Sequence, residues 1–300
     1  GSRALIGAPW DQTPRGPLSG SVRVFVRAGT TWAEEATLLA TGVPDRYFGR
    51  ELAISADASR ALIVGLDSTG GPAAVVFVRT GTTWAEEGRL ASTGLGSSAG
   101  FGCSVALTAD GSRALVGVYA DTRTAFEGGS ARVYLRTGTS WAEEAMLVAS
   151  DAGSGDYFGF SVSISRDGSR ALIGVPADNT AAGLDAGSAR VFARTGTSWA
   201  EEGTLVASGG AGADWFATSV SLAGDGAVGI VSNDRDTTAG GAGAGSARVF
   251  VRAGTLWREE TTLVAPDGAA SDGLGGQVSL STDARLALTS AEGDDTPRGT

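Results

Sequence analysis

The chain has 300 residues, 42% of them hydrophobic, which is enough apolar material for a large buried core. It has 23 basic and 33 acidic residues, and the net charge of −10 excludes nucleic acid and anionic membrane surfaces as expected partners. No apolar run is long enough to span a bilayer, so we expect no membrane insertion.

Side chains that commonly perform catalysis are scarce. The sequence has no His, which removes the usual general base and the commonest zinc ligand. Its one cysteine, Cys103, cannot form an internal disulfide, and we expect a small, partly buried residue there instead of a reactive thiol. Every basic residue is Arg, and together with abundant Ala and Gly this composition is typical of a GC-rich bacterial genome. We therefore expect a protein that is not an enzyme.

Four strands are predicted in one stretch of the chain, taken in order. Residues 158–165 alternate apolar and polar side chains, the pattern of a half-buried strand. An Asp-Gly turn leads to residues 171–176, which are nearly all apolar. A polar loop then leads to the strand at 188–194, and a Gly-containing turn to the strand at 199–207. No segment has sustained helical periodicity.

This four-strand unit recurs along the chain. Its last strand contains a Trp-Ala-Glu-Glu motif, Trp-Arg-Glu-Glu in the fifth copy, whose tryptophans are 52 to 58 residues apart. A second marker keeps the same step. The tryptophans are Trp32, Trp84, Trp141, Trp199 and Trp257, and the second series is Phe48, Phe101, Phe158 and Phe216, with Leu274 in the fifth copy. Four short antiparallel strands every ~55 residues are typical of a propeller blade, with an extended β-array as the alternative.

The repeated motif is predicted to be structural, because an active site needs its residues only once. Arg194 and Trp199 should face each other across a hairpin, with the guanidinium against the indole. Glu201 and Glu202 are adjacent in a strand, so their side chains point to opposite faces and cannot form an acid–base pair. We expect the tryptophan to pack between blades and the glutamates to charge an exposed outer strand.

Phe-Gly at 158–159 followed by Gly-Val-Pro at 174–176, and Gly-Ala-Pro at 7–9, give the chain a family resemblance. The pattern resembles the FG-GAP repeat of integrin-α-type β-propellers, closest to the bacterial form with a Trp in the last strand. Some copies drift, as where Ala217 replaces the Gly and Leu274 the Phe. The resemblance implies a propeller whose first strand lines the axis and whose Trp strand lies outermost, with a role in binding or adhesion.

The expected fold is therefore all-β, a β-propeller of four-stranded antiparallel blades with about five blades present. The FG-GAP-type domain spans residues 1–300, with repeat units at roughly 1–47, 48–100, 101–157, 158–215 and 216–273 and a partial unit at 274–300. The second strand of the unit occurs six times and the others five times. We therefore expect an open arc, or a ring with a frayed end, as a fragment of a six- or seven-bladed propeller within a longer protein.

Calcium-binding members of this family have a loop rich in Asp between the first and second strands. Here each copy has one Asp in a tight turn, where an Asx hydrogen bond uses it: Asp57, Asp110, Asp167, Asp225 and Asp283. A second series follows the Gly-Ala-Pro position: Asp11, Asp121, Asp178, Asp234 and Asp294. Asp234 and Asp236 are the weak candidates for a metal, but we favour a capping role and expect no cofactor.

Binding residues are expected on one face, where the longest and least repetitive loops emerge at residues 10–20, 120–129, 209–215 and 233–245. Residues outside the repeat pattern that are aromatic or Arg make the best anchors there. The candidates are Trp10, Arg15, Tyr119, Arg123, Phe126 and Arg235. Tyr47, Tyr157 and Trp215 each precede the repeated aromatic position, so they either plug the rim between blades or join the binding face.

Three functions fit these observations. The first is a binding or adhesion module, secreted or on the cell surface of a bacterium, that recognises a protein or carbohydrate. The second is the propeller part of a secreted polysaccharide lyase or hydrolase, which would need a unique inward cluster of carboxylates or Arg. The third is a structural spacer with no ligand.

Overall fold

The computed structural model describes residues 2–42, 46–67, 70–90, 94–96 and 98–294, and within these ranges the chain forms β-strands and no helix. The strands form six antiparallel sheets that follow one another along the chain: one of three strands, four of four strands and one of two strands. Connections within each sheet join neighbouring strands, which is the arrangement expected of propeller blades.

Each strand takes one of four places in its sheet. The first, innermost place is taken by β4 (Arg46–Ile54), β8 (Phe101–Leu107), β12 (Val162–Ile164), β16 (Val220–Leu222) and β20 (Leu274–Leu280). The second place is taken by β1 (Arg3–Ala8), β5 (Arg60–Leu66), β9 (Arg113–Val118), β13 (Arg170–Val175), β17 (Val228–Asn233) and β21 (Ala287–Ala291). The third place is taken by β2 (Ser21–Ala28), β6 (Pro72–Thr80), β10 (Ser130–Thr137), β14 (Ser188–Thr195) and β18 (Ser246–Ala253). The outermost place is taken by β3 (Thr31–Leu38), β7 (Thr83–Leu90), β11 (Ser140–Leu147), β15 (Ser198–Leu205) and β19 (Leu256–Leu263).

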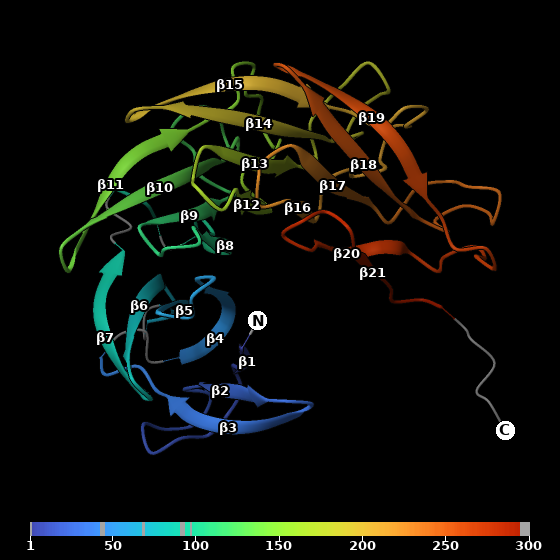
Figure 1. Ribbon diagram of the computed structural model, residues 1–300. Coiled ribbons are helices and arrows are strands. Elements are labelled where there is room, and N and C mark those ends of the chain that lie inside the picture. Colours follow the sequence, from blue (N-terminus) through green and yellow to red (C-terminus); the bar gives the residue numbers. More distant parts are fainter. Residues whose placement is uncertain (1, 43–45, 68–69, 91–93, 97, 295–300) are drawn as a thin grey trace, which may run out of the picture.

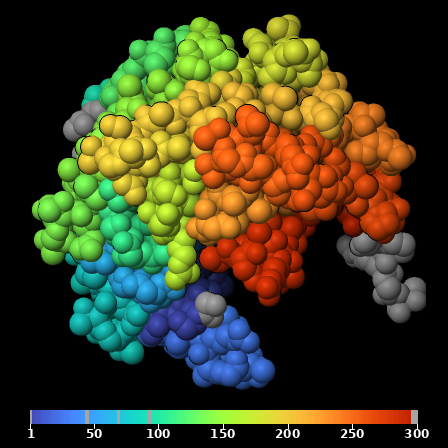
Figure 2. All heavy atoms as spheres, turned by 45° about the horizontal axis from the view of Figure 1, so that its top comes forward, coloured from blue at the N-terminus to red at the C-terminus, as the bar shows by residue number. Residues whose placement is uncertain are grey.

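The sheets are arranged as an open arc around a common axis (Figure 1). The first sheet begins at the second place with β1, and the last ends at the second place with β21. These two terminal sheets, blue and red in the figures, do not close into one blade, and an opening separates the blue from the orange and red segments at the lower right of Figure 2. The predictions of an open arc and of an outermost Trp strand are confirmed.

The hydrophobic core consists of layers between neighbouring sheets, so the sheets inside the arc are covered on both faces. One such layer joins Val133 and Phe158 to Val175 and Phe192, from the third and fourth sheets. The tryptophan of each following sheet packs against the edge of a layer, as Trp199 does here. The sequence prediction that tryptophan packs between blades is therefore confirmed.

The Phe-Gly and Gly-Ala-Pro positions meet between neighbouring sheets, which explains why most copies have glycine at both. A Cβ on Gly117 of β9 would lie 2.0 Å from the carbonyl oxygen of Gly159, the glycine of the next Phe-Gly pair. Gly159 has a φ of 89°, and it donates its N–H to Gly174 O at 3.1 Å in its own sheet. Close backbone contact therefore leaves no room for a side chain at Gly117, and the positive φ of Gly159 favours glycine there.

This contact also shortens some inner strands relative to the predicted range 158–165. Phe158 makes a parallel backbone bridge to Gly129 of the preceding sheet, so its backbone belongs to the joint between sheets. Regular pairing in β12 begins only at Val162, opposite Ile173. The other three strands of this sheet begin and end within two residues of their predicted bounds.

Candidate functional site

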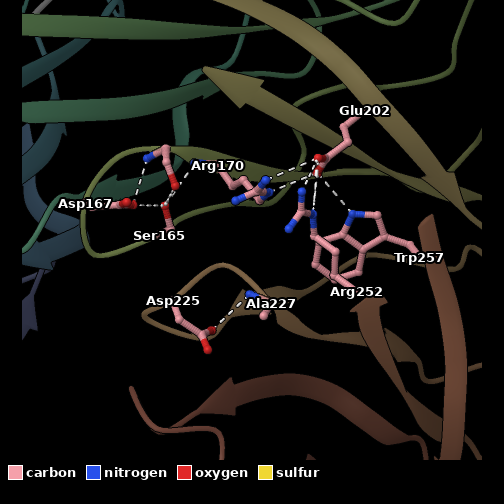
Figure 3. Close-up of polar contacts among 9 residues, drawn as sticks. Ser165, Asp167, Arg170, Glu202, Asp225, Ala227, Arg252 and Trp257 are labelled. Atoms are coloured by element: carbon pink, nitrogen blue, oxygen red, sulfur yellow. Dashed lines mark hydrogen bonds and ion pairs between the residues drawn. The ribbon is translucent and has the colours of Figure 1, made fainter. Parts of the chain in front are cut away.

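The repeated Glu-Glu pair forms joints between sheets, because its second carboxylate is buried among cations (Figure 3). Glu202 accepts hydrogen bonds from Arg170 of its own sheet at 2.9 Å and from Arg252 of the next sheet at 2.9 Å. The indole of Trp257, also in the next sheet, donates to Glu202 at 3.3 Å. Burial opposes ionisation, but these hydrogen bonds outweigh it and lower the pKa of Glu202 to about 2.

The first glutamate of the pair points the other way, toward the preceding sheet. Glu201 accepts from Arg190 at 3.0 Å and from the backbone N–H of Ser150 at 3.0 Å. The expectation that the two side chains point to opposite faces is confirmed. The expectation that both charge an exposed outer strand is wrong, since the side chain of Glu202 is only 7% exposed.

Arg194 faces Trp199 in the hairpin register, as predicted. Its guanidinium, however, donates to the carbonyl oxygens of Gly168 at 2.7 Å and Gly196 at 2.6 Å, so the predicted stacking on the indole is wrong. Carbonyl oxygens at the hairpin turns offer Arg stronger hydrogen bonds than the ring face does.

The aspartates of the tight turns form Asx hydrogen bonds, which confirms their predicted role. Asp167 accepts from Ser165 Oγ at 2.8 Å and from Ser169 N–H at 2.9 Å, and Asp225 accepts from Ala227 N–H at 2.9 Å (Figure 3). A hollow of about 700 Å³ opens among these turns, lined by Asp57, Asp110, Asp167 and Asp225 with Ala56, Ala109, Arg166 and Gly224. Its walls come from one position of the repeat, so they offer little specificity.

The second aspartate series needs a correction in the fifth sheet. Asp178 accepts from Arg190 at 2.6 Å and closes the turn after β13. In the fifth sheet Asp236 does this, accepting from Arg248 at 2.7 Å, and the predicted member Asp234 does not. Asp236 lies 58 residues after Asp178, the same step that separates Phe216 from Phe158, so Asp236 and not Asp234 is the equivalent residue. No group of three or more His, Cys, Asp or Glu side chains that could hold a metal ion occurs in the described part of the chain.

The long loops fasten neighbouring sheets together through their backbones. Tyr157 N–H donates to Glu127 O at 3.2 Å, and Trp215 N–H donates to Asp185 O at 3.2 Å. Each bond joins a loop between the second and third strands to the segment that precedes the next inner strand. We call the side of the arc formed by these two kinds of connection the long-loop face. These backbone hydrogen bonds hold the loops of one sheet against the next.

Two of the candidate ligand residues are highly exposed on this face, and two are tied to the scaffold. Trp10 is 74% exposed, and Phe126, at the tip of the β9–β10 loop, is 69% exposed. Arg15 donates to Gly42 O at 2.9 Å and to Ala40 O. Arg123 lies 3.8 Å from Asp121.

The other two candidates, Tyr119 and Arg235, are part of a row of aromatic side chains and an Arg stacked on it. Sequence analysis did not predict this row as a unit. The ring of Tyr119 lies 5.8 Å from that of Tyr157, and Tyr157 lies 6.2 Å from Trp215. The guanidinium of Arg235 stands 4.5 Å over the Trp215 ring. Tyr47 holds the same repeat position as Tyr157 and Trp215, and we call Tyr47, Tyr119, Tyr157 and Trp215 the aromatic rim.

Three residues of the aromatic rim have backbone conformations that side chains rarely adopt. The φ angles of Tyr47, Tyr157 and Trp215 are 52°, 61° and 54°. Glycine holds the same position in the third sheet at Gly100, where a Cβ would lie 2.2 Å from the ring of Tyr119. The ring of Tyr119 therefore occupies the space that the missing side chain leaves free.

Two small hollows adjoin on the long-loop face and share Arg50. One, of about 290 Å³, is lined by Pro9, Trp10, Tyr47, Arg50 and Leu66. The other, of about 190 Å³, lies between Arg50 and Tyr119 and includes Cys103. Burial raises the pKa of the Cys103 thiol to about 12, which agrees with the expected inert residue.

Arg50 and its neighbour Glu51 depart from the repeat in the inner strands. Burial raises the pKa of Glu51 to about 7, against the opposing effect of Arg50. The residues equivalent to Glu51 are serines in three other sheets: Ser104, Ser161 and Ser219. Sequence analysis missed Arg50 and Glu51, although the departure of Glu51 from serine was visible in the aligned repeats.

Sheets of this kind around a common axis define a β-propeller fold, although the arc is open. The family model described as "FG-GAP repeat" matches three consecutive segments, residues 141–192, 199–250 and 257–300. The chain is therefore an FG-GAP repeat protein, as the sequence motifs predicted. A search of curated proteins gave no match. No helix in the described part of the chain is long and apolar enough to cross a membrane.

Two solved structures are similar to the chain. A candidate 6-phosphogluconolactonase from Bacteroides uniformis aligns with a TM-score of 0.61 and 12% identity, over 96% of this chain and 74% of that chain. TolB from Acinetobacter baumannii aligns with a TM-score of 0.46 and 12% identity, over 97% of this chain and 62% of that chain. The first likeness shows the fold alone, and the second is too weak to support an argument.

Proposed function

We propose that the chain is a non-enzymatic binding or adhesion module, secreted or on the cell surface of a bacterium. It recognises a protein or glycan partner through the aromatic rim and the exposed side chains of the long-loop face. The observation that supports this proposal is the strained backbone at Tyr47, Tyr157 and Trp215.

The strained backbone at these three positions is informative because the fold also accepts glycine there, which adopts the same φ without strain. Gly100 and Gly273 hold the same position with φ angles of 71° and 67°, and glycine adopts this conformation at no steric cost. A side chain there costs roughly 1–3 kcal/mol, and such strain is concentrated at functional sites. Partly exposed aromatic rings in three such places are well explained by a partner that contacts them.

The enzyme alternative is less well supported by the same residues. Glycosidases use two carboxyl groups on either side of the scissile bond, roughly 5–10 Å apart. Among the described residues no carboxyl side chain lines either hollow, and Glu51 is the one carboxyl in β4. A lyase or hydrolase activity would therefore have to rely on groups from outside the rim.

The proposal is tested by screening the purified chain against immobilised glycans and extracellular proteins, and by comparing variants on each hit. Trp10→Ala should weaken binding by about 1–3 kcal/mol and leave folding intact. Leu256→Ala is the matched control, since Leu256 is 76% exposed on the outermost strand β19. Trp199→Ala should lower stability and leave the affinity of the folded protein unchanged.

Two results would contradict the proposal. One is a partner whose binding survives Trp10→Ala and Phe126→Ala but is lost on mutation of the Asp-Gly turns. The other is release of oligosaccharide products from any polysaccharide that binds, which would establish the enzyme alternative.

A further inference from the structure

The arginines of this acidic chain fall into two groups. Many that recur with the repeat are neutralised, as Arg170 is by Glu202 and Arg248 by Asp236. The recurring hairpin arginines Arg27, Arg79 and Arg194 donate to backbone carbonyl oxygens instead. Three arginines outside the repeat, Arg46, Arg50 and Arg235, have no carboxylate oxygen within 4.0 Å among the described residues. Arg46 and Arg50 belong to the same strand, β4, and two unneutralised cations so close together are unexpected in a chain with a net charge of −10.

Each of these arginines stands beside an aromatic side chain of the long-loop face. Arg46 lies 5.3 Å from the ring centroid of Tyr47, and Arg235 lies 4.5 Å from that of Trp215. Arg50 lines both small hollows, between Trp10 and Tyr47 on one side and Tyr119 on the other. Glu51, its neighbour in the strand, has a pKa raised to about 7 by burial, so Arg50 is not neutralised below that pH.

We propose that the long-loop face binds an acidic glycan, with sugar rings against Trp10, Tyr47 and Tyr119 and a sugar carboxylate on Arg50. This inference depends on the proposed function and names the ligand class of the same face. A planar guanidinium matches a carboxylate in a bidentate pair, and aromatic rings pack against the apolar faces of sugars. The position of Arg50 between Tyr47 and Tyr119 thus matches an anion carried between two sugar rings.

The size of the hollows favours a glycan over a folded protein. At about 290 and 190 Å³, each is smaller than the roughly 300–1,000 Å³ of a small-molecule site, so each takes one part of a larger ligand. Arg50 lies where the two hollows meet, so its guanidinium stands between two spaces that would each take one sugar ring. A folded partner would instead need about 800 Å² of complementary surface, which separate small hollows do not offer.

The test measures calorimetric affinity for three probes at low salt: hexagalacturonate, its methyl ester and hexaglutamate. We expect hexagalacturonate to bind, the uncharged ester to bind at least tenfold more weakly, and added salt to weaken binding of the acid. Arg50→Gln should reduce affinity for hexagalacturonate about tenfold, because a hydrogen bond to a charged group is lost. Arg258→Gln is the control: Arg258 is exposed on β19, and its substitution should change nothing.

Several results would overturn the inference. Equal affinity for the acid and its ester, no effect of Arg50→Gln, or no binding of hexagalacturonate would each do so. Tighter binding of hexaglutamate with the same dependence on Arg50 would identify an acidic peptide as the ligand. The proposed function fails separately, if no partner found by screening is sensitive to Trp10→Ala.

Discussion

Glu51 shows how one residue outside the repeat can alter the behaviour of the whole chain. It stands where three other sheets have serine, and burial raises its pKa from 4.5 to about 7. A carboxyl group whose pKa is raised by folding favours the folded state when protonated. Its contribution is therefore lost as the pH rises from about 4.5 through 7.

We expect Glu51→Ser to stabilise the protein above pH 7 by about 1–3 kcal/mol and to flatten the decline in stability between about pH 5 and about pH 8. Urea unfolding at these two values measures both effects. Gln277→Ser, at the equivalent place in β20, is the control and should leave the pH dependence unchanged. An identical pH profile for Glu51→Ser and the wild type would show that Glu51 is ionised and solvated at neutral pH.

Neighbouring sheets are held together by joints, and the contact between the Phe-Gly and Gly-Ala-Pro positions is the tightest of these. Gly117→Ala would place a Cβ 2.0 Å from Gly159 O, an atom of the backbone that cannot move without displacing the next sheet. We expect a loss of about 2–4 kcal/mol in the free energy of unfolding.

Gly203→Ala is the matched control for this substitution. Its Cβ would lie 3.6 Å from Trp257, an ordinary contact, and two other repeats have alanine at this place, Ala36 and Ala145. Thermal or urea unfolding of both variants measures the difference. Equal stability of Gly117→Ala and Gly203→Ala would show that the joint is looser than described.

The glutamate joints give a second prediction at this scale. Glu202→Gln leaves Arg170 and Arg252 without their carboxylate and should cost about 2–4 kcal/mol at neutral pH. Because the pKa of Glu202 is lowered to about 2, its contribution is present above pH 4.5 and is lost as the pH falls toward 2. The variant should therefore lose less stability than the wild type on acidification, as measured by urea unfolding across that range.

Glu260 provides the control for the glutamate joint. It is the fifth copy of the same residue, and no ion-pair partner lies within 4.0 Å of it among the described residues. Glu260→Gln should therefore leave the free energy of unfolding nearly unchanged. A large cost there would indicate that strand propensity matters more than the buried ion pairs.

At the scale of the molecule, the arc is held by protein contacts that use the acidic side chains internally. The turn aspartates accept backbone N–H bonds, and Asp121, Asp178 and Asp236 are paired with arginines. We therefore expect the melting temperature to be nearly unchanged by EDTA. Calorimetric scans with EDTA and with added calcium measure this, and a fall of many degrees in EDTA would reveal a calcium site near Asp234.

The sequence by itself determined the repeating unit and its strand order. Period-2 alternation, Asp-Gly turns and the spacing of the tryptophans are local, so they are visible within about 55 residues. Counting the six second strands against five of each other kind also predicted the open arc, which β1 and β21 confirm. The tight-turn role of Asp167 followed from the same local chemistry.

Tertiary structure alone decided what lies between the sheets. From the sequence alone Glu202 is interpreted as a surface charge. Its partners Arg252 and Trp257 are 50 and 55 residues away along the chain, and only the packing of the sheets places them beside it. Equally, nothing local joins Trp10 to Arg50, or Tyr119 to Trp215 through Tyr157. Sequence patterns report the neighbours of a residue within its own strand and hairpin, whereas joints and the rim depend on how successive sheets pack around the axis.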